Sequence, residues 1–254
     1  MRILVLNPNT TQGVTDLLVG AGRAVAAPGT ILKPLTATRG VPYISTRSEA
    51  QIGGATAMEM LADHHAGADA AIIAAFGDPG LLGARELFDI PVIGMSEAAM
   101  LTACMLGHRF AIVTFASALR GWYRDCVDLH GMGYRCTGIH ALDQSFASIS
   151  NVQDEMEDLL VALANRAVET DDADVVILAG APLAGLAQRV RARIPVPLID
   201  PITAAVKQAE ALIALSPGKA KAGSFRRPAA KETRGLHGAL AARFEHRTDT
   251  NPPA

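Results

Sequence analysis

The chain has few thiols and few aromatic rings, and both shortages limit what the protein can be. Its 254 residues include three cysteines, Cys104, Cys126 and Cys136, and no two of them stand in a C-x-x-C spacing. An odd number without that spacing argues against a disulfide framework or a zinc ribbon. Aromatic residues make up 4% of the chain and hydrophobic residues 50%, which favours an aliphatic core. We therefore expect a reduced, cytoplasmic protein.

Long apolar runs and familiar cofactor motifs are missing as well. No run reaches the roughly 18 apolar residues of a membrane span. The opening stretch MRILVLNPNT is too short in its apolar part for a secretory signal, so we interpret it as a first buried strand. The chain has no P-loop, no G-x-G-x-x-G and no G-x-S-x-G. Membrane insertion, nucleotide-loop chemistry and serine-hydrolase chemistry are therefore not expected.

Charge is spread unevenly along the chain. The net charge is −2, yet residues 216–254 hold eight Lys/Arg and three Asp/Glu, which leaves the first 215 residues clearly acidic. This segment is rich in Gly, Pro, Ala and Arg, so we expect it to be mostly disordered, with a short helix possible at about 236–246. It is either a solvated extension or a tail for acidic partners. Nucleic-acid binding has only this tail in its favour and is not expected.

Short apolar runs alternate with helical patterns along the first 215 residues. Strands are expected at 2–6, 31–36, 69–75, 91–95, 109–115, 136–142, 174–180 and 196–200. Helices are expected near 10–26, 49–66, 79–88, 96–107, 117–131, 152–169, 183–193 and 202–215. This alternation predicts parallel sheets with crossover helices. Continuously apolar runs such as AAIIAA and VVILAGA are typical of strands that are buried on both faces.

The chain also contains an internal repeat. RILVLNPNT resembles RFAIVTFAS, DAAIIAAFGDPG resembles DVVILAGAPLAG, and PVIGMSEAA resembles PLIDPITAA, in the same order and at offsets of 105 to 107 residues. The repeat predicts two pseudo-symmetric, flavodoxin-like α/β lobes, residues 1–107 and 108–215, with the helix at 202–215 able to return to the first lobe. If the carboxyl ends of the two sheets face one another, position 75 faces position 181 across an interlobe cleft.

Polar and small residues gather at that expected cleft. Asn and Thr after the first strand can cap a helix or hold a carboxylate or imide oxygen, and the two interpretations stay open. Asp78 and Pro79 fit the N-cap and N1 positions of the next helix, so Asp78 is as easily structural as reactive. The predicted substrate-binding residues are Asn9, Thr10, Phe76, Gly77, Asp78, Thr114, Ala181, Pro182 and Asp200.

One further pair has the spacing of metal ligands. Cys126 and His130 are four residues apart on an expected helix, so both side chains would lie on one face. A third convincing ligand on that face is missing, and a lone thiol is more often a packed core residue. No metal site is therefore expected.

Taken together, the motifs resemble those of the aspartate/glutamate/hydantoin racemase family, with hydantoin and allantoin racemases the most similar. The resemblance rests on NPNT, FGDPG, GMSEAAM at 94–100, and APLAG followed by PLID and a final helix, and it runs from Met1 to about Leu215. It implies a cofactor-independent homo-oligomer with an interlobe site. It further implies that one cysteine from each lobe acts on opposite faces of the substrate, one thiolate removing a proton beside a carbonyl and the other thiol returning one.

The positions that the resemblance assigns to those cysteines are Ala75 and Ala181. A methyl group exchanges no proton, so the two-thiol reaction is not available to this chain. The leading hypothesis is a cofactor-independent isomerase-family enzyme fold that binds and acts on a small cyclic amide or amino-acid-like carbonyl compound, and the second is a non-catalytic ligand-binding protein. Three explanations of the alanines stay open: an engineered double Cys-to-Ala variant, a relative that only binds ligand, and a divergent lyase or hydrolase. In the last case Asp78 is the first candidate base and Glu97 the second.

Overall fold

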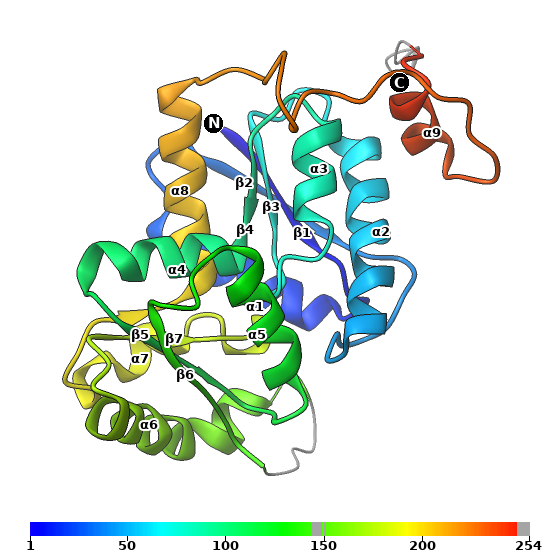
Figure 1. The fold of residues 1–254 in the computed structure, drawn as a ribbon. Coiled ribbons are helices and arrows are strands. Elements are labelled where there is room, and N and C mark those ends of the chain that lie inside the picture. Colours follow the sequence, from blue (N-terminus) through cyan, green and yellow to red (C-terminus); the bar gives the residue numbers. More distant parts are fainter. Residues whose placement is uncertain (144–148, 150, 248–254) are drawn as a thin grey trace.

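The computed structural model, which describes residues 1–143, 149 and 151–247, folds into two α/β lobes (Figure 1). Each lobe is built on a four-stranded parallel sheet, with strand order β2-β1-β3-β4 in lobe 1 and β6-β5-β7-β8 in lobe 2. The strands are β1 Arg2–Asn7, β2 Ile31–Thr36, β3 Ala70–Ile73, β4 Val92–Gly94, β5 Phe110–Thr114, β6 Cys136–Ala141, β7 Val175–Leu178 and β8 Leu198–Ile199. The predicted two-lobed α/β fold is confirmed.

The helices follow the predicted positions, with one exception. They are α1 Gln12–Val25, α2 Arg47–His64, α3 Leu81–Leu87, α4 Met95–Leu106, α5 Leu119–Leu129, α6 Val152–Asp171, α7 Leu186–Val190, α8 Pro201–Leu215 and α9 Gly238–Phe244. The helix expected at 183–193 is divided into short pieces, with 3₁₀ turns at Ala181–Leu183 and Arg191–Arg193 on either side of α7. Pro182 and the left-handed backbone of Gly185 (φ +88°) account for the break before α7, because neither conformation continues an α-helix.

Side chains of β1 alternate between two hydrophobic clusters. Ile3 and Val5 pack with residues of α1 and α8, whereas Leu4 and Leu6 pack with residues of α2 and α3. All four are fully buried. Both faces of this sheet are therefore covered by helices, which is the physical reason for the continuously apolar strand sequence.

The two lobes exchange their last helices. Helix α4, which follows the last strand of lobe 1, packs on β5, β7 and β8 of lobe 2, and α8 returns to pack on α1, β3 and β4 of lobe 1. The two exchanged helices also pack against each other where the two lobes meet (Figure 1). One hydrophobic cluster consequently runs through both lobes. This arrangement brings the turns that follow β3 and β7 towards each other.

The C-terminal segment is held on lobe 1 as far as residue 247. Helix α9 lies within the predicted range 236–246 and packs on α2, where Leu240 is 4% exposed. Arg243 lies over the ring of Phe88 and donates to the carbonyl of Leu87 at 3.0 Å. The described part of the segment therefore differs from the disordered tail that its composition predicts, because one leucine and one arginine anchor it. Residues 248–254 lie outside the described residues.

None of the helices among the described residues is long and apolar enough to cross a membrane.

Candidate functional site

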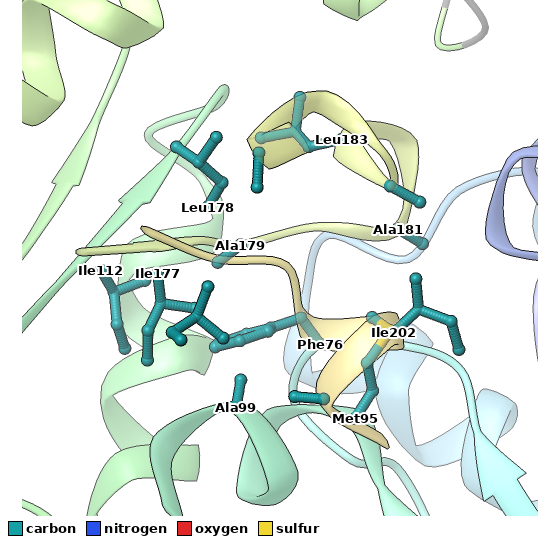
Figure 2. Packing of buried hydrophobic residues seen from close by; sticks show 14 of the residues in the cluster. Phe76, Met95, Ala99, Ile112, Ile177, Leu178, Ala179, Ala181, Leu183 and Ile202 are labelled. Atoms are coloured by element: carbon teal, nitrogen blue, oxygen red, sulfur yellow. The ribbon is translucent and has the colours of Figure 1, made fainter. Parts of the chain in front are cut away.

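The turns that carry Ala75 and Ala181 converge on one group of aromatic rings. The ring centroids of Phe76 and Tyr123 lie 4.7 Å apart, and Tyr123 in turn contacts Trp122 at 5.6 Å. Gly77 packs directly on the Trp122 indole, while a Cβ atom on Gly180 would lie 2.7 Å from the ring of Phe115 and 3.6 Å from the Tyr123 hydroxyl oxygen. Figure 2 shows Phe76 reaching from lobe 1 to the end of β7, between Ala99 and Ala179. The two turns thus meet between the lobes.

Alanine side chains stand where the resemblance places the thiols. Ala75 is 6% exposed and Ala181 is 7% exposed. Each is followed at once by a predicted site residue, Phe76 and Pro182, both of which are buried. The immediate surroundings are therefore apolar and aromatic, and neither alanine offers a group that could remove or donate a proton.

Polar residues of the first loop mostly hold the loop itself. Asn7 donates to the hydroxyl of Thr15 at 2.9 Å and to Asn9 Oδ1 at 3.1 Å. Asn9 Oδ1 also accepts the Thr11 N–H at 2.9 Å, so its oxygen shapes the entry to α1. Thr10, half-buried, is tied through its backbone N–H to the carbonyl of Val41. Of the predicted ligand contacts in this loop, Thr10 is the more accessible one.

Thr114 occupies the corresponding place in lobe 2. Its hydroxyl donates to the carbonyl of Ala179 at 2.8 Å and also hydrogen-bonds the hydroxyl of Tyr123. Burial raises the pKa of Tyr123 well above its ordinary value, with a smaller contribution from nearby Tyr43, so the phenol keeps its proton. Thr114 is fully buried, and its role is to fix the end of β5 against β7 and Tyr123.

Both helices that begin at this interlobe region start without a side-chain cap. The N-cap of α1 is Thr11 and that of α5 is Ala118, and neither side chain accepts a hydrogen bond from the helix. Neither first turn contains an acidic residue. The first N–H groups of α5, those of Leu119 and Arg120, donate to the carbonyls of Ala116 and Ser117, so the N-terminus of α1 is the better place for a carbonyl or carboxylate oxygen.

The Asp78 carboxylate has a structural role. The helix that follows its turn, α3, has Gly80 as N-cap, so the prediction that Asp78 caps that helix is wrong. Its carboxylate instead accepts the N–H groups of Ser96 and Glu97, each at 2.8 Å, at the start of α4. The side chain is fully buried and also accepts from His130 Nε2 at 3.1 Å. A carboxylate with three donors is a poor candidate for a general base.

Asp200 plays the matching part in lobe 2. It is the N-cap of α8, where its Oδ1 accepts the N–H groups of Ile202 and Thr203, while Oδ2 accepts the N–H of Gly185 at 2.5 Å. Burial raises the pKa of Asp200 against the opposing effect of those three donors. The residue is 7% exposed. It fixes the turn that carries Ala181.

A cluster of titratable groups that was not predicted from the sequence lies beside Asp78. His130, at the end of α5, places Nε2 against Asp78 and Nδ1 3.5 Å from Glu97 Oε1, and it also hydrogen-bonds Cys126. Burial alone would lower the pKa of His130, but the hydrogen bonds to Asp78, Cys126 and Glu97 outweigh it and raise the pKa to about 11. The i, i+4 spacing of Cys126 and His130 was visible in the sequence. Their third partner was not, because Asp78 comes from the other lobe.

A solvent-connected groove of about 560 Å³ borders this cluster. It lies between α2 and α5, and the turn Gly77–Gly80 forms part of its lining together with Trp122 and Cys126. Arg47 of α2 and Asp125 of α5 form an exposed ion pair beside it. Gly77 and Asp78 are the predicted site residues that line this groove, whereas Asn9, Thr114 and Asp200 are buried and do not line it.

Known proteins resemble the chain over nearly its whole length. Residues 3–209 match the family described as Asp/Glu/hydantoin racemase. A hydantoin racemase of Paenarthrobacter aurescens is 32% identical over 234 residues, which cover 91% of this chain and 99% of that protein. The structure of an allantoin racemase from Klebsiella pneumoniae superposes with a TM-score of 0.89 at 35% identity, covering 94% of this chain and 98% of that one.

A second allantoin racemase structure, from Pseudomonas fluorescens, gives a TM-score of 0.86 at 33% identity and covers 92% of this chain and 100% of that one. The match to the family extends across both sheets and includes the turns that carry Ala75 and Ala181. The chain belongs to the Asp/Glu/hydantoin racemase family.

Proposed function

We propose that this protein binds a small cyclic amide of the hydantoin or allantoin type between its lobes and does not racemise it by exchange between two thiols. The observation that carries the proposal is the convergence of the two turns on one aromatic cluster, with Ala75 and Ala181 at the positions that the family resemblance gives to the thiols. This convergence supports a site for a planar ligand, and two methyl groups stand where the resemblance puts the proton-transfer pair.

The surroundings suit such a ligand. Phe76, Phe115 and Tyr123 are buried beside the two turns and make the surroundings of Ala75 and Ala181 aromatic, and aromatic walls with a few polar groups are typical of small-molecule sites. The N-terminus of α1, which has no side-chain cap, supplies N–H donors for a ring carbonyl oxygen. The buried Tyr123 hydroxyl stays protonated and donates to Thr114, whose own proton is given to Ala179, so its oxygen is an acceptor in reach of the second turn.

A different reaction in the same place is the weaker alternative. Removal of a proton beside a carbonyl requires a base within hydrogen-bond reach. Asp78 was the first candidate, yet its oxygens already accept from Ser96, Glu97 and His130. Glu97, the second candidate, is paired with Arg85 and His130, and although burial opposes the shift these partners lower its pKa to about 2. Neither carboxylate is placed to act as a base in a lyase or hydrolase reaction.

Proton exchange and binding can be measured side by side. The protein is incubated in D₂O with allantoin and with a single enantiomer of a 5-substituted hydantoin, and the signal of the ring-carbon proton is followed by NMR, with a protein-free sample as the blank. We expect exchange at the blank rate, together with a rise in Tm on addition of one of these compounds. Exchange above the blank would contradict the loss of proton transfer, and no binding of any tested compound would contradict the proposed site.

Restoring the thiols tests the assigned positions. The double variant Ala75→Cys/Ala181→Cys is expected to gain exchange and racemisation, because each lobe then presents a thiol. Its matched control is Ala75→Ser/Ala181→Ser, which adds nearly the same volume but no group that ionises near neutral pH. If binding is kept and the cysteine variant exchanges no faster than the serine variant, the two positions have been assigned wrongly.

The family resemblance implies a homo-oligomer and the cysteine content a cytoplasmic protein, and both remain predictions. Light scattering of the purified protein will give the mass of the assembly to compare with the 26.5 kDa of one chain.

A further inference from the structure

We propose that Asp78, Cys126 and His130 form a binding site for a zinc-like divalent cation that joins the two lobes. One carboxylate oxygen, the thiol sulfur and one imidazole nitrogen all lie within 4.8 Å of one another. Asp78 comes from the turn after β3 in lobe 1, while the other two come from α5 of lobe 2. This site is separate from the proposed ligand site and does not depend on it.

The donor set is one that zinc prefers. Zinc binds thiolate, imidazole and carboxylate ligands, and three protein ligands leave a fourth position for water or another ligand. Four-coordinate zinc with bonds of about 2.0–2.3 Å separates its ligand atoms by roughly 3.3–3.8 Å. His130 Nε2 and Asp78 Oδ2 are 3.1 Å apart, so a cation requires only a small outward movement of either side chain.

The groups around these three atoms are those that orient metal ligands. Glu97 Oε1 lies 3.5 Å from His130 Nδ1 and is itself held by Arg85. A carboxylate on Nδ1 fixes the imidazole ring and leaves Nε2 for the cation, an arrangement that recurs around zinc-bound histidines. The N–H groups of Ser96 and Glu97 fix the Asp78 carboxylate in the same way. The ligands are therefore held in place before a cation arrives.

The protons can be accounted for. Cys126 carries a proton on sulfur, and His130 Nε2 now donates one to Asp78. Cation binding replaces both, so two protons leave for solvent while the thiolate, the neutral imidazole and the carboxylate share the charge of the cation. The groove between α2 and α5, which Asp78 and Cys126 help to line, gives the cation a route to these atoms.

The same three residues also have the composition of a catalytic thiol with a base and an orienting acid. Cys126 is only 3% exposed, and burial together with nearby Asp78 raises the pKa of its thiol. An activated nucleophile requires a lowered pKa and an accessible sulfur. The cation site is therefore the interpretation that the geometry favours.

Cobalt(II) is the probe for this site, because its complexes with thiolates absorb in the near ultraviolet. Untagged, metal-free protein is titrated with Co²⁺, and we expect one equivalent per chain, a thiolate-to-cobalt charge-transfer band, and its loss when Zn²⁺ displaces the cobalt. Cys126→Ser should abolish the band. Glu97→Gln should keep the band and weaken Co²⁺ affinity about 10–100-fold. The matched controls Cys104→Ser and Cys136→Ser should behave like the parent protein.

The titration of the parent protein is decisive even if a variant folds poorly. Absence of the band at a slight excess of Co²⁺, or a spectrum without thiolate character, would overturn the proposal. Survival of the band in Cys126→Ser, or its loss in Cys104→Ser or Cys136→Ser, would do the same. The folding of each variant is checked by its circular dichroism melting curve.

Discussion

In each lobe one turn is bonded to a helix N-terminus, but the bonds run in opposite directions. The turns are the one after β3 in lobe 1 and the one after β7 in lobe 2. Each turn must be fixed to the N-terminus of the helix that follows the next strand. In lobe 1 the carboxylate is on the turn, where Asp78 accepts the first N–H groups of α4. In lobe 2 the carboxylate is on the helix, where Asp200 caps α8 and accepts the N–H of Gly185 in the turn. Both lobes therefore join the turn to the helix through a carboxylate, but the carboxylate belongs to the turn in lobe 1 and to the helix in lobe 2.

The two turns also differ in where their remaining support comes from. The first accepts a hydrogen bond from the other lobe, from His130, and packs on the Trp122 indole, while Ser96 of its own lobe accepts the Gly77 N–H. The second packs on α1 of lobe 1, but its hydrogen bonds come from its own lobe, because Gln153 of α6 donates to the carbonyls of Pro182 and Ala184 at 2.9 and 2.8 Å. We infer that the hydrogen bonds of the first turn depend on how the lobes sit together, whereas those of the second turn are made within lobe 2. Five substitutions test this difference.

Adding a methyl group to the first turn should have the largest effect. Gly77 has φ +116° and lies on the Trp122 indole, so Gly77→Ala combines backbone strain with overpacking and should cost about 3–5 kcal/mol of unfolding free energy. Gly180→Ala, at φ +123°, should cost less because its Cβ atom would lie 2.7 Å from Phe115 and overlap that ring less than a Gly77 Cβ atom would overlap the Trp122 indole. Urea denaturation gives both values, and Gly20→Ala in α1, with nothing within 4 Å of its Cβ, is the control. Equal losses in the two turns would contradict the interlobe contact as the cause.

Neutralising the two carboxylates should give the next effect. Asp78→Asn places an amide NH₂ against donors and removes the charge that faces His130, so we expect a loss of about 2–4 kcal/mol. Asp200→Asn keeps an acceptor for α8 and conflicts only with the Gly185 N–H, so about 1–2 kcal/mol is expected. Thermal and urea unfolding measure the difference. A larger loss in Asp200→Asn would show that the interlobe partner adds nothing to the first turn.

How far the sequence predicted this molecule depends on the range of each interaction. Apolar runs such as the one ending at Ile73, together with the repeat at a nearly constant offset, were enough for all eight strands and both lobes. These signals are local, or are copied within the chain. The helix expected at 183–193 was less accurate, because Pro182 and Gly185 break it within two turns.

Site geometry was harder to predict than the fold, because side-chain partners come from distant segments. Asp78 caps α4 rather than the adjacent helix, and its donors lie 18 and 19 residues further along the chain. Asp78, which lies beside Cys126 and His130, comes from the other lobe. The packing of Leu240 on lobe 1 could not be predicted either, because composition indicates only the average burial of a segment and not the contact of a single residue.

Removing the amide that supports the second turn should have a smaller and more local effect. Gln153→Leu leaves the carbonyls of Pro182 and Ala184 without this donor in a buried place and should cost about 1–3 kcal/mol. Hydrogen exchange should accelerate at residues 183–185 and stay unchanged at 76–78. Asn165→Leu, which removes an amide bonded to the exposed carbonyl of Arg193, is the matched control and should change stability little. Faster exchange in both turns would mean that they are not supported independently.

The smallest effect concerns the loops at the opposite edge of the sheets. In lobe 1, Glu210 of α8 accepts from the Ala27 N–H and the Thr30 hydroxyl, each at 2.7 Å. In lobe 2 the loop between α5 and β6 is instead held by Arg135, which donates to carbonyls at the end of α4. Burial opposes the shift, but the bonds from Lys207, Ala27 and Thr30 lower the pKa of Glu210 below its ordinary 4.5. A carboxylate with a lowered pKa stabilises the fold above its unfolded-state pKa and loses that effect as the pH falls through the folded value.

Glu210→Gln should therefore cost about 0.5–1.5 kcal/mol at neutral pH, and the difference from the parent protein should shrink as the pH falls from 4.5. Arg135→Gln is the comparison, because a guanidinium keeps its charge throughout the acid range and its cost should not follow that pH dependence. Urea denaturation at neutral pH and at pH values below 4.5 measures both. The contrary outcome is a stability cost of Arg135→Gln that falls with pH in parallel with that of Glu210→Gln. The loss of stability in acid would then be a property of the whole fold and not of the Glu210 carboxylate.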